Sequence, residues 1–265
     1  MSLYKDICEA KIFFISGPCV LDTDSNAALI AKKIYELREK YKVPFIFKTS
    51  FDKANRQSIE SYRGVGFEKS AEMLKRISKE YKLPILTDIH ESYQAELVAF
   101  AEVIQIPAFL CRQTDLLLAA GKTKKIVNIK KGQFASAEQM SDSAKKVVST
   151  GNNNIILTER GNFFGYGDLI VDFRNISKMK KTGLPVVLDA THSVQRPGGK
   201  GSCSGGEKEY IKPYACAAVE FGVNGIFMEV HPEPTKALCD GPNSLNLDEF
   251  EDVVQSVIKK IKGER

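Results

Sequence analysis

The chain has 265 residues, of which 43% are hydrophobic and 27% are charged, and 38 basic residues face 33 acidic ones. This composition suits one large buried core and argues against disorder, and the small, dispersed positive excess does not indicate nucleic-acid binding. No apolar run approaches the roughly 18 residues that span a bilayer, and the first six residues lack a signal-peptide core. We therefore expect a cytoplasmic protein, without membrane or nucleic-acid partners, that acts on an anionic small molecule.

Eight short apolar runs recur along the chain, and each is followed at once by polar residues. The runs cover residues 12–16, 45–47, 84–87, 103–106, 126–129, 155–158, 186–188 and 225–228. Helical patterns lie between them at 27–40, 67–81, 91–100, 115–122, 138–149 and 207–221, and an amphipathic helix is predicted at 247–261. The stretch 168–182 is ambiguous.

Continuously apolar strands that alternate eight times with helices indicate an all-parallel sheet covered by helices. Eight such units close into a (β/α)8 TIM barrel, which we expect to form a single α/β domain over residues 1–265. An open doubly wound sheet is the alternative, because one miscounted strand would change the fold. In a closed barrel, the polar residues that follow the strands all meet at one rim.

The densest polar cluster follows the second predicted strand, at residues 48–56, Lys-Thr-Ser-Phe-Asp-Lys-Ala-Asn-Arg. Cations fixed at the end of a strand suit recognition of a phosphorylated or carboxylated molecule, although a solvated loop would have the same composition. Other strands are followed by Arg112, Lys130, Lys131 and Arg160. Because cations in one mouth repel one another unless anions occupy it, the pattern predicts a ligand with several anionic groups. Some of these cations could instead pair with Asp52, Asp88, Glu159 or Asp189.

Four potential metal ligands follow strands that would be neighbours in a closed barrel: Cys19, His192, Glu229 and Asp240. A thiolate, an imidazole and two carboxylates could hold Zn²⁺, Fe²⁺ or Mn²⁺, but spacing alone is a weak signal. Lone histidines are more often structural, and we expect this of His231. The six cysteines lie far apart without Cys-x-x-Cys pairs, so they predict neither a disulfide framework nor a zinc ribbon.

Residues 196–209 contain five glycines and begin shortly after His192, but they do not match a phosphate-binding P-loop. We expect a mobile lid over the barrel mouth, with an inert surface loop as the alternative.

Eight motifs, in chain order, resemble those of the 3-deoxy-D-manno-octulosonate-8-phosphate (KDO-8-phosphate) synthase family. They are Gly17-Pro18-Cys19, 48–56 (KTSFDKANR), 87–91 (TDIHE), 105–115 (QIPAFLCRQTD), 130–134 (KKGQF), 157–161 (LTERG), 189–195 (DATHSVQ) and 228–234 (MEVHPEP). The resemblance implies a barrel-shaped transferase that condenses phosphoenolpyruvate with D-arabinose 5-phosphate and water. The products would be KDO 8-phosphate, for lipopolysaccharide biosynthesis, and inorganic phosphate.

The resemblance also implies roles for individual residues. Phosphoenolpyruvate would be bound by Lys48, Lys53, Lys131 and Arg160. The sugar phosphate would be bound by Asn55, Arg56 and Ser58, with Arg112 contributed by a neighbouring subunit of a homotetramer. Further substrate-site residues would be Asp88, His90 and Gln105, and the residues expected to take part in catalysis are Lys53, Asn55, His192 and Asp240.

Members of this family with Cys in the Gly-Pro-Cys motif resemble the metal-dependent branch, so the resemblance implies a divalent metal on Cys19, His192, Glu229 and Asp240. The chain departs from the family pattern in two places. Gln57 stands where Ser is usual, and Cys239-Asp-Gly-Pro242 is similar to the metal-independent branch. The identity of the metal and the strictness of the requirement therefore stay open.

Two other functions fit parts of the pattern. A sister synthase that uses erythrose 4-phosphate, in aromatic amino-acid synthesis, typically has Lys-Pro-Arg-Thr where this chain has Lys53-Ala-Asn-Arg56. A non-catalytic phosphosugar-binding barrel is the second alternative, and release of phosphate from phosphoenolpyruvate would exclude it.

Overall fold

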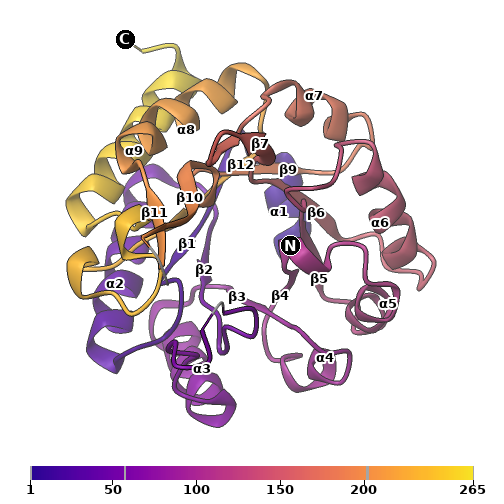
Figure 1. Ribbon diagram of the computed structural model, residues 1–265, viewed down its shortest axis with the longest axis horizontal. Helices are drawn as coiled ribbons and strands as arrows, with labels where there is room; N and C mark the ends of the chain where they lie inside the picture. The colour runs from indigo at the N-terminus through magenta and orange to yellow at the C-terminus, as the bar shows by residue number, and fades with distance from the viewer. Residues whose placement is uncertain (1, 57, 201–202, 265) are drawn as a thin grey trace.

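The computed structural model describes residues 2–56, 58–200 and 203–264 and contains a closed barrel of eight parallel strands (Figure 1). The barrel strands are β1 (Phe13–Gly17), β2 (Phe45–Lys48), β3 (Ile85–Asp88), β4 (Val103–Ile106), β5 (Ile126–Lys130), β6 (Ile155–Glu159), β9 (Val186–Asp189) and β12 (Gly225–Glu229). They pair in the order β1-β12-β9-β6-β5-β4-β3-β2, and β2 returns to β1. The predicted (β/α)8 fold is confirmed, and the open doubly wound alternative is wrong.

Helices surround the barrel (Figure 1). They are α2 (Asp24–Tyr41), α3 (Phe67–Tyr81), α4 (Gln94–Leu97), α5 (Thr114–Lys122), α6 (Gln139–Val148), α7 (Arg174–Lys180), α8 (Ile211–Glu220) and α9 (Leu247–Lys262). The last helix has well-defined ends: Asn246 and Glu249 form a capping box, and Gly263 ends the helix in the left-handed conformation, with φ 73°. These ends agree with the amphipathic pattern that predicted it.

The predicted helix at 91–100 is wrong in extent, because α4 is only four residues long. The Gln94 side-chain oxygen accepts hydrogen bonds from the backbone N–H groups of His90 and Glu91, at 2.7 and 3.0 Å. Those bonds hold the chain in a turn before the helix. The ambiguous stretch 168–182 resolves into strand β8 (Asp168–Ile170), paired with β7 (Asn162–Gly165), followed by α7.

A short first helix, α1 (Leu3–Glu9), was not predicted. It closes the barrel at the N-terminal ends of the strands, where the fully buried Ile7 packs with barrel residues that include Phe13 and Ile156. Figure 1 shows this helix behind the barrel opening. The Tyr4 hydroxyl donates a hydrogen bond to the Ile155 carbonyl oxygen at 3.1 Å, so the helix is tied to β6 as well as packed against the core.

The glycine-rich stretch forms an antiparallel hairpin of β10 (Gln195–Lys200) and β11 (Cys203–Gly206), and its residues 201 and 202 lie outside the described part of the chain. At the base of the hairpin, Arg196 forms ion pairs with Asp168 and, at 3.0 Å, with Glu207. The movement of this hairpin as a lid stays a prediction. Among the described residues, every helix is too short or too polar to cross a membrane.

Tyr4 gives the N-terminal closure a measurable pH dependence, because burial raises its pKa from 10.0 to about 12. The folded state stabilises the neutral phenol, so this stability is complete below pH 10 and is lost as the pH rises toward 12. We expect Tyr4→Phe to lower the free energy of unfolding by about 1 kcal/mol at pH 8 through loss of its hydrogen bond. In urea unfolding, the advantage of the wild type should shrink between pH 10 and 11; an unchanged advantage would contradict this account.

Candidate active site

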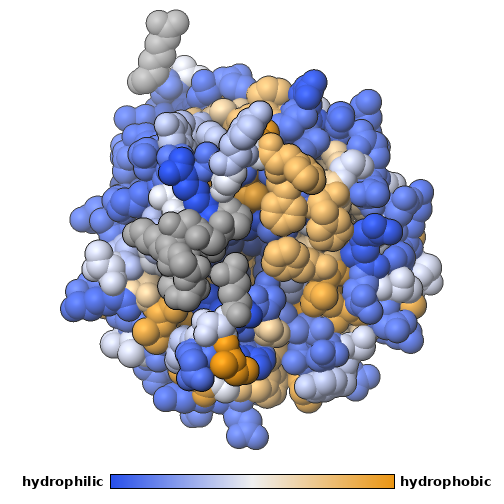
Figure 2. All heavy atoms as spheres, in the orientation of Figure 1, coloured by the Kyte–Doolittle hydropathy of each residue, from blue (hydrophilic) through white to orange (hydrophobic). Residues whose placement is uncertain are grey.

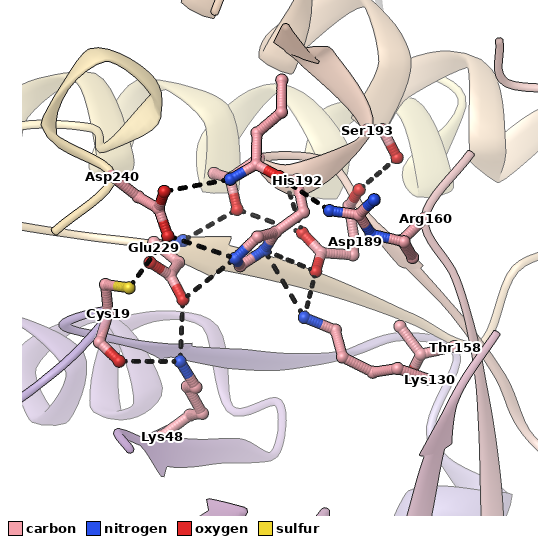
Figure 3. Close-up of polar contacts among 12 residues, drawn as sticks. Cys19, Lys48, Lys130, Thr158, Arg160, Asp189, His192, Ser193, Glu229 and Asp240 are labelled. Atoms are coloured by element: carbon pink, nitrogen blue, oxygen red, sulfur yellow. Dashed lines mark hydrogen bonds and ion pairs between the residues drawn. The ribbon is translucent and has the colours of Figure 1, made fainter. Parts of the chain in front are cut away.

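The predicted metal ligands meet at the C-terminal ends of three neighbouring strands, β1, β12 and β9 (Figure 3). Gly17 at the end of β1 pairs with Glu229 at the end of β12. Cys19 follows β1, His192 follows β9, and Asp240 lies in the loop after β12. Closure of the sheet therefore brings Cys19 and Asp240 into contact across 221 positions of sequence, with Sγ 3.0 Å from Asp240 Oδ2.

Gly17 lets the first two strands approach closely at the site. A Cβ atom on Gly17 would lie 1.9 Å from the Lys48 carbonyl oxygen. With glycine there, the Ser50 N–H donates to the Cys19 carbonyl oxygen at 3.3 Å, and the Lys48 ammonium donates to the same oxygen at 3.2 Å. This packing explains why the Gly-Pro-Cys segment faces the polar cluster that follows β2.

His192 is oriented as metal-binding histidines usually are. Its Nδ1 lies 2.7 Å from Asp189 Oδ2, which leaves Nε2 facing Glu229 Oε1 at 3.6 Å and Asp240 Oδ2 at 3.7 Å. The other carboxylate oxygen of Glu229, Oε2, is buried without a hydrogen-bond partner in the described structure. A carboxylate-held imidazole beside an unsatisfied carboxylate oxygen fits a divalent cation.

A second thiol, Cys239, lies in the same place. The potential ligands form two groups that share Asp240: Cys19 with Cys239, and His192 with Glu229; within each group the ligand atoms lie within 4.8 Å of one another. The sequence analysis counted the adjacent Asp240 as a ligand but not Cys239, because adjacent side chains of a loop need not point to the same site.

The ionisable groups around this site shift one another's pKa values. Burial opposes the ionisation of Asp240, but the neighbouring His192 holds its pKa well below the ordinary value. Burial likewise opposes the ionisation of Glu229, and Lys48 and His192 lower its pKa. Burial and the adjacent Cys239 raise the pKa of the Cys19 thiol well above its ordinary value. A divalent cation would favour the thiolate, since metals bind the deprotonated form.

Two arginines at the mouth keep unused donors. Arg160 Nη2 donates to Gln195 Oε1 at 2.7 Å, and Arg56 Nε donates to the Tyr62 carbonyl oxygen at 3.1 Å. Arg160 Nη1 and Arg56 Nη2 are buried and have no partner in the described structure. A buried donor without an acceptor costs about 1–3 kcal/mol. Each guanidinium would therefore gain free energy by donating a hydrogen bond to an anionic group of a ligand.

Lys53 is a third cation at the mouth, after Arg56 and Arg160. Its ammonium donates to Ser50 Oγ at 2.9 Å. Burial opposes its charge, but the negative fields of Cys19, Cys239 and Glu229 hold the pKa of Lys53 well above its ordinary value. The lysine therefore stays charged beside the potential metal ligands.

The remaining cations form buried ion pairs, as the sequence allowed for some of them. Lys48 Nζ lies 2.7 Å from Glu229 Oε1, and Lys130 pairs with Asp189. In Figure 3 both lysines point toward the carboxylates of the site.

Lys131, a predicted substrate contact, has partners inside the protein. Its fully buried ammonium lies 3.3 Å from Glu159 Oε1 and also donates to one side-chain and three backbone oxygens. Those four acceptors belong to Gly132, Ala135, Gly161 and Asn162. Its contact with phosphoenolpyruvate stays a prediction. Lys130 faces the site, with Nζ 3.4 Å from His192 Nδ1.

The loop that carries the predicted sugar-phosphate residues is closed on itself by one hydrogen bond and tied to the segment after β1 by another. The Lys53 N–H donates to the Arg63 carbonyl oxygen, and the Tyr62 hydroxyl donates to the Leu21 carbonyl oxygen, both at 2.9 Å. On this loop Asn55 is exposed and Ser58 is half-buried. Gln57 lies outside the described residues.

Four other predicted residues have different surroundings. Asp88 and His90 contact each other, with His90 Nε2 3.4 Å from Asp88 Oδ2, and Asp88 Oδ1 is buried without a partner in the described structure. Gln105 lies in a polar layer inside the barrel, where its oxygen accepts from Asn128 at 3.1 Å. Arg112 is exposed beyond β4.

His231 is structural, as expected. Its Nε2 lies 3.0 Å from Asp22 Oδ2, and its Nδ1 accepts from the Glu233 N–H at 3.0 Å.

Sequence reasoning missed Gln195. Its side-chain oxygen accepts from Arg160, and its Nε2 donates to Asp240 Oδ1 at 3.0 Å. One amide thus joins the anion-binding arginine to the potential metal ligand. Its place in the 189–195 motif was the only signal in the sequence. An uncharged amide cannot be recognised from the sequence as a link between two charged side chains.

Known proteins resemble this chain over almost its whole length. Residues 8–262 match the model of the DAHP synthetase I family. A 2-dehydro-3-deoxyphosphooctonate aldolase of Syntrophotalea carbinolica is 48% identical over 248 residues, covering 93% of this chain and 90% of the relative. Proteins of the same name from Cyanothece sp. and Desulfatibacillum aliphaticivorans are 49% and 50% identical, over 92% and 94% of this chain and 90% and 92% of their own lengths.

The buried pair of Lys48 and Glu229 gives a stability prediction. Lys48→Met leaves the Glu229 charge buried and unpaired, which should lower the free energy of unfolding by about 3–5 kcal/mol. The double variant Lys48→Met/Glu229→Gln should recover much of this loss because it also removes the charge. Urea unfolding of the metal-free protein measures both. Lys145→Met, which breaks the exposed pair with Asp142, is the control and should change little; equal losses in Lys48→Met and Lys145→Met would contradict the assignment.

Proposed function

The chain belongs to the DAHP synthetase I family, and from this membership we propose that it is a KDO-8-phosphate synthase. It condenses phosphoenolpyruvate with D-arabinose 5-phosphate and water, and it yields 3-deoxy-D-manno-octulosonate 8-phosphate and inorganic phosphate. The name shared by relatives at 48–50% identity supports this choice of sugar within the family. We further propose a cytoplasmic location, because the substrates are phosphorylated intermediates that do not cross membranes unaided.

The observation that carries the proposal is the convergence of unused cationic donors beside a set of metal ligands. In the described part of the chain, Arg160 and Arg56 each hold a buried N–H group without an acceptor, and Lys53 stays charged near the thiol of Cys19. Two phosphates and one carboxylate, the anionic groups of the two substrates together, supply acceptors for these donors. A barrel that only binds a phosphosugar would not need potential metal ligands beside these donors.

We assign phosphoenolpyruvate to the side of the mouth formed by Lys53 and Arg160. Lys48 and Lys130 lie at the base of this side, where their pairs with Glu229 and Asp189 leave their charges partly compensated. The predicted contact to Lys131, which follows Lys130 in the chain, is kept as part of this assignment.

We assign the sugar phosphate to the loop after β2. Arg56 supplies an unused guanidinium donor there, and Asn55 and Ser58 supply neutral hydrogen-bonding groups on the same loop. Asp88 and His90 lie at the end of the neighbouring strand β3, where the unpartnered Asp88 oxygen can accept from a sugar hydroxyl.

We propose that Cys19, His192, Glu229 and Asp240 hold a divalent metal. The carboxylate-held His192 and the unsatisfied oxygen of Glu229 support this assignment. Bound there, Zn²⁺, Fe²⁺ or Mn²⁺ would supply Lewis-acid polarisation of the sugar aldehyde or of water.

The reaction proceeds by attack of carbon 3 of phosphoenolpyruvate on the aldehyde carbon of the pentose. The C2=C3 π electrons form the new C–C bond, and the aldehyde oxygen takes up a proton. Water adds at carbon 2, and the tetrahedral intermediate loses inorganic phosphate when the bond between carbon 2 and the bridging oxygen breaks. Lys53 and Arg160 stabilise the developing charge, while the fixed orientation of both substrates supplies much of the rate. Asn55, His192 and Asp240 border the reacting groups and complete the proposed catalytic set.

We also propose a homotetramer in which Arg112 reaches a neighbouring site. Phe109, Phe134 and Phe164 are exposed in the segments that follow the adjacent strands β4, β5 and β6, Phe164 within the short strand β7, and Arg112 belongs to the same sector. Figure 2 shows a strip of apolar side chains on the corresponding face. Exposed aromatic side chains beside an arginine suit burial between subunits.

A comparison of two sugars tests the proposed activity. Purified protein with phosphoenolpyruvate should release phosphate and form the eight-carbon product with arabinose 5-phosphate. Its kcat/KM should be about 100-fold lower with erythrose 4-phosphate, because contacts built for the longer sugar then stay unmade. Faster turnover of erythrose 4-phosphate would support the sister synthase, and no phosphate release with either sugar would support the binding barrel.

Mixed oligomers test the contribution of Arg112. Arg112→Ala and Lys53→Ala should each be nearly inactive alone. When they are co-expressed with different tags and isolated together, about a quarter of wild-type activity should return, because some sites combine an intact Lys53 with an intact partner arginine. Arg56→Ala mixed with Lys53→Ala is the control and should not recover, since both residues serve the same site from one chain. Equal behaviour of the two mixtures would place Arg112 in its own subunit's site or outside any site.

A further inference from the structure

We propose that Cys239 is a further metal ligand and that the site is a dithiolate centre selective for thiophilic divalent cations. This inference rests on the metal binding proposed above and adds a residue outside the set implied by the family resemblance. Its basis is the group formed by Cys19, Cys239 and Asp240.

The two thiols are held beside the same carboxylate oxygen. Cys19 Sγ and Cys239 Sγ face Asp240 Oδ2 at 3.0 and 3.3 Å. Both cysteines are buried, with 4% and 6% exposure. Their sulfur atoms lie 2.6 Å apart, so they would move apart to about 3.8 Å when both bind one tetrahedral ion through bonds of about 2.3 Å. Two thiols that converge on one carboxylate form the donor arrangement of a soft metal site.

The backbone after β12 is shaped to present Cys239 and Asp240 together. Asp240 adopts the left-handed conformation, with φ 50° and ψ 27°, which residues other than glycine rarely adopt and Asp tolerates better than most. Its carbonyl oxygen accepts from the Asn243 N–H at 3.0 Å and from the Ser244 hydroxyl at 3.1 Å. Gln195 fixes the remaining carboxylate oxygen. The loop therefore holds two adjacent side chains toward Cys19.

The second thiolate changes which ion the site prefers. A single thiolate among an imidazole and carboxylates accepts Mn²⁺ and Fe²⁺ as well as Zn²⁺, whereas each added thiolate favours the softer ions. Two cations, Lys53 and Arg56, lie close to Cys239. These two cations would in turn offset part of the negative charge of a second thiolate.

Cobalt substitution provides the test, because thiolate-to-cobalt charge transfer absorbs in the near ultraviolet in proportion to the number of thiolates bound. The protein is kept reduced with a phosphine, made metal-free and titrated with Co²⁺ in the absence of substrates. Cys239→Ser should lower the absorption per bound cobalt to about half, and Cys19→Ser/Cys239→Ser should abolish it. In competition with Co²⁺, Cys239→Ser should weaken Zn²⁺ by about tenfold or more while Mn²⁺ changes little.

Cys8→Ser, at an exposed thiol remote from the site, is the matched control and should leave the spectrum unchanged. Circular dichroism and the urea midpoint establish that each variant is folded. An unaltered charge-transfer intensity and Zn²⁺ affinity in folded Cys239→Ser would overturn the proposal. Since no substrate is present, this result is independent of the sugar specificity and of the activity itself.

Discussion

The hydrogen-bonded pairing of β1 with β12 is the constraint on which the site depends. It joins the two ends of the sheet, and its register sets Gly17 beside Glu229. Lys48 then reaches both the Cys19 carbonyl oxygen and the Glu229 carboxylate, so one ammonium spans the closing seam. Without that closure, Cys19 and Asp240 would lie at opposite edges of a sheet, and Cys19 would be separated from the group formed by His192, Glu229 and Asp240.

Charge balance separates the cations of the mouth into two kinds. Lys48, Lys130 and Lys131 have carboxylate partners inside the protein, and these pairs let the folded chain bury charge without a ligand. Among the described residues, Arg56 and Arg160 keep a buried donor without a partner, and these are the groups that would gain most from the proposed anionic substrates. The protein thus pairs the charges of its three lysines internally and leaves donors of its two arginines for a ligand.

The barrel strands could be predicted to within a residue because each is a continuous apolar run that ends in a polar group, and eight such runs allowed few folds. The short strands β7, β8, β10 and β11 were not predicted. The direction of Lys130 could also have been predicted from the sequence, because strand residues alternate between faces. Gln105 and Asn128 point into the barrel, so Lys130, two residues after Asn128, shares that direction. The positions of Cys239 and Gln195 could not be predicted, since they depend on loop conformations such as the left-handed turn at Asp240. Helix α1 is too short to have a strong periodic pattern, and it is stabilised mainly by burial of Ile7 against strands far along the chain.

Gln195 is also the first residue of strand β10. The amide that links Arg160 to Asp240 is therefore anchored in the root of the glycine-rich hairpin. Any displacement of that root alters both contacts at once. If the proposed anion and metal bind, each would be coupled to the position of the hairpin, and by thermodynamic linkage the hairpin would change the affinity for each by the same factor that this ligand changes the hairpin equilibrium. One amide would then couple the two proposed binding events to the loop above them.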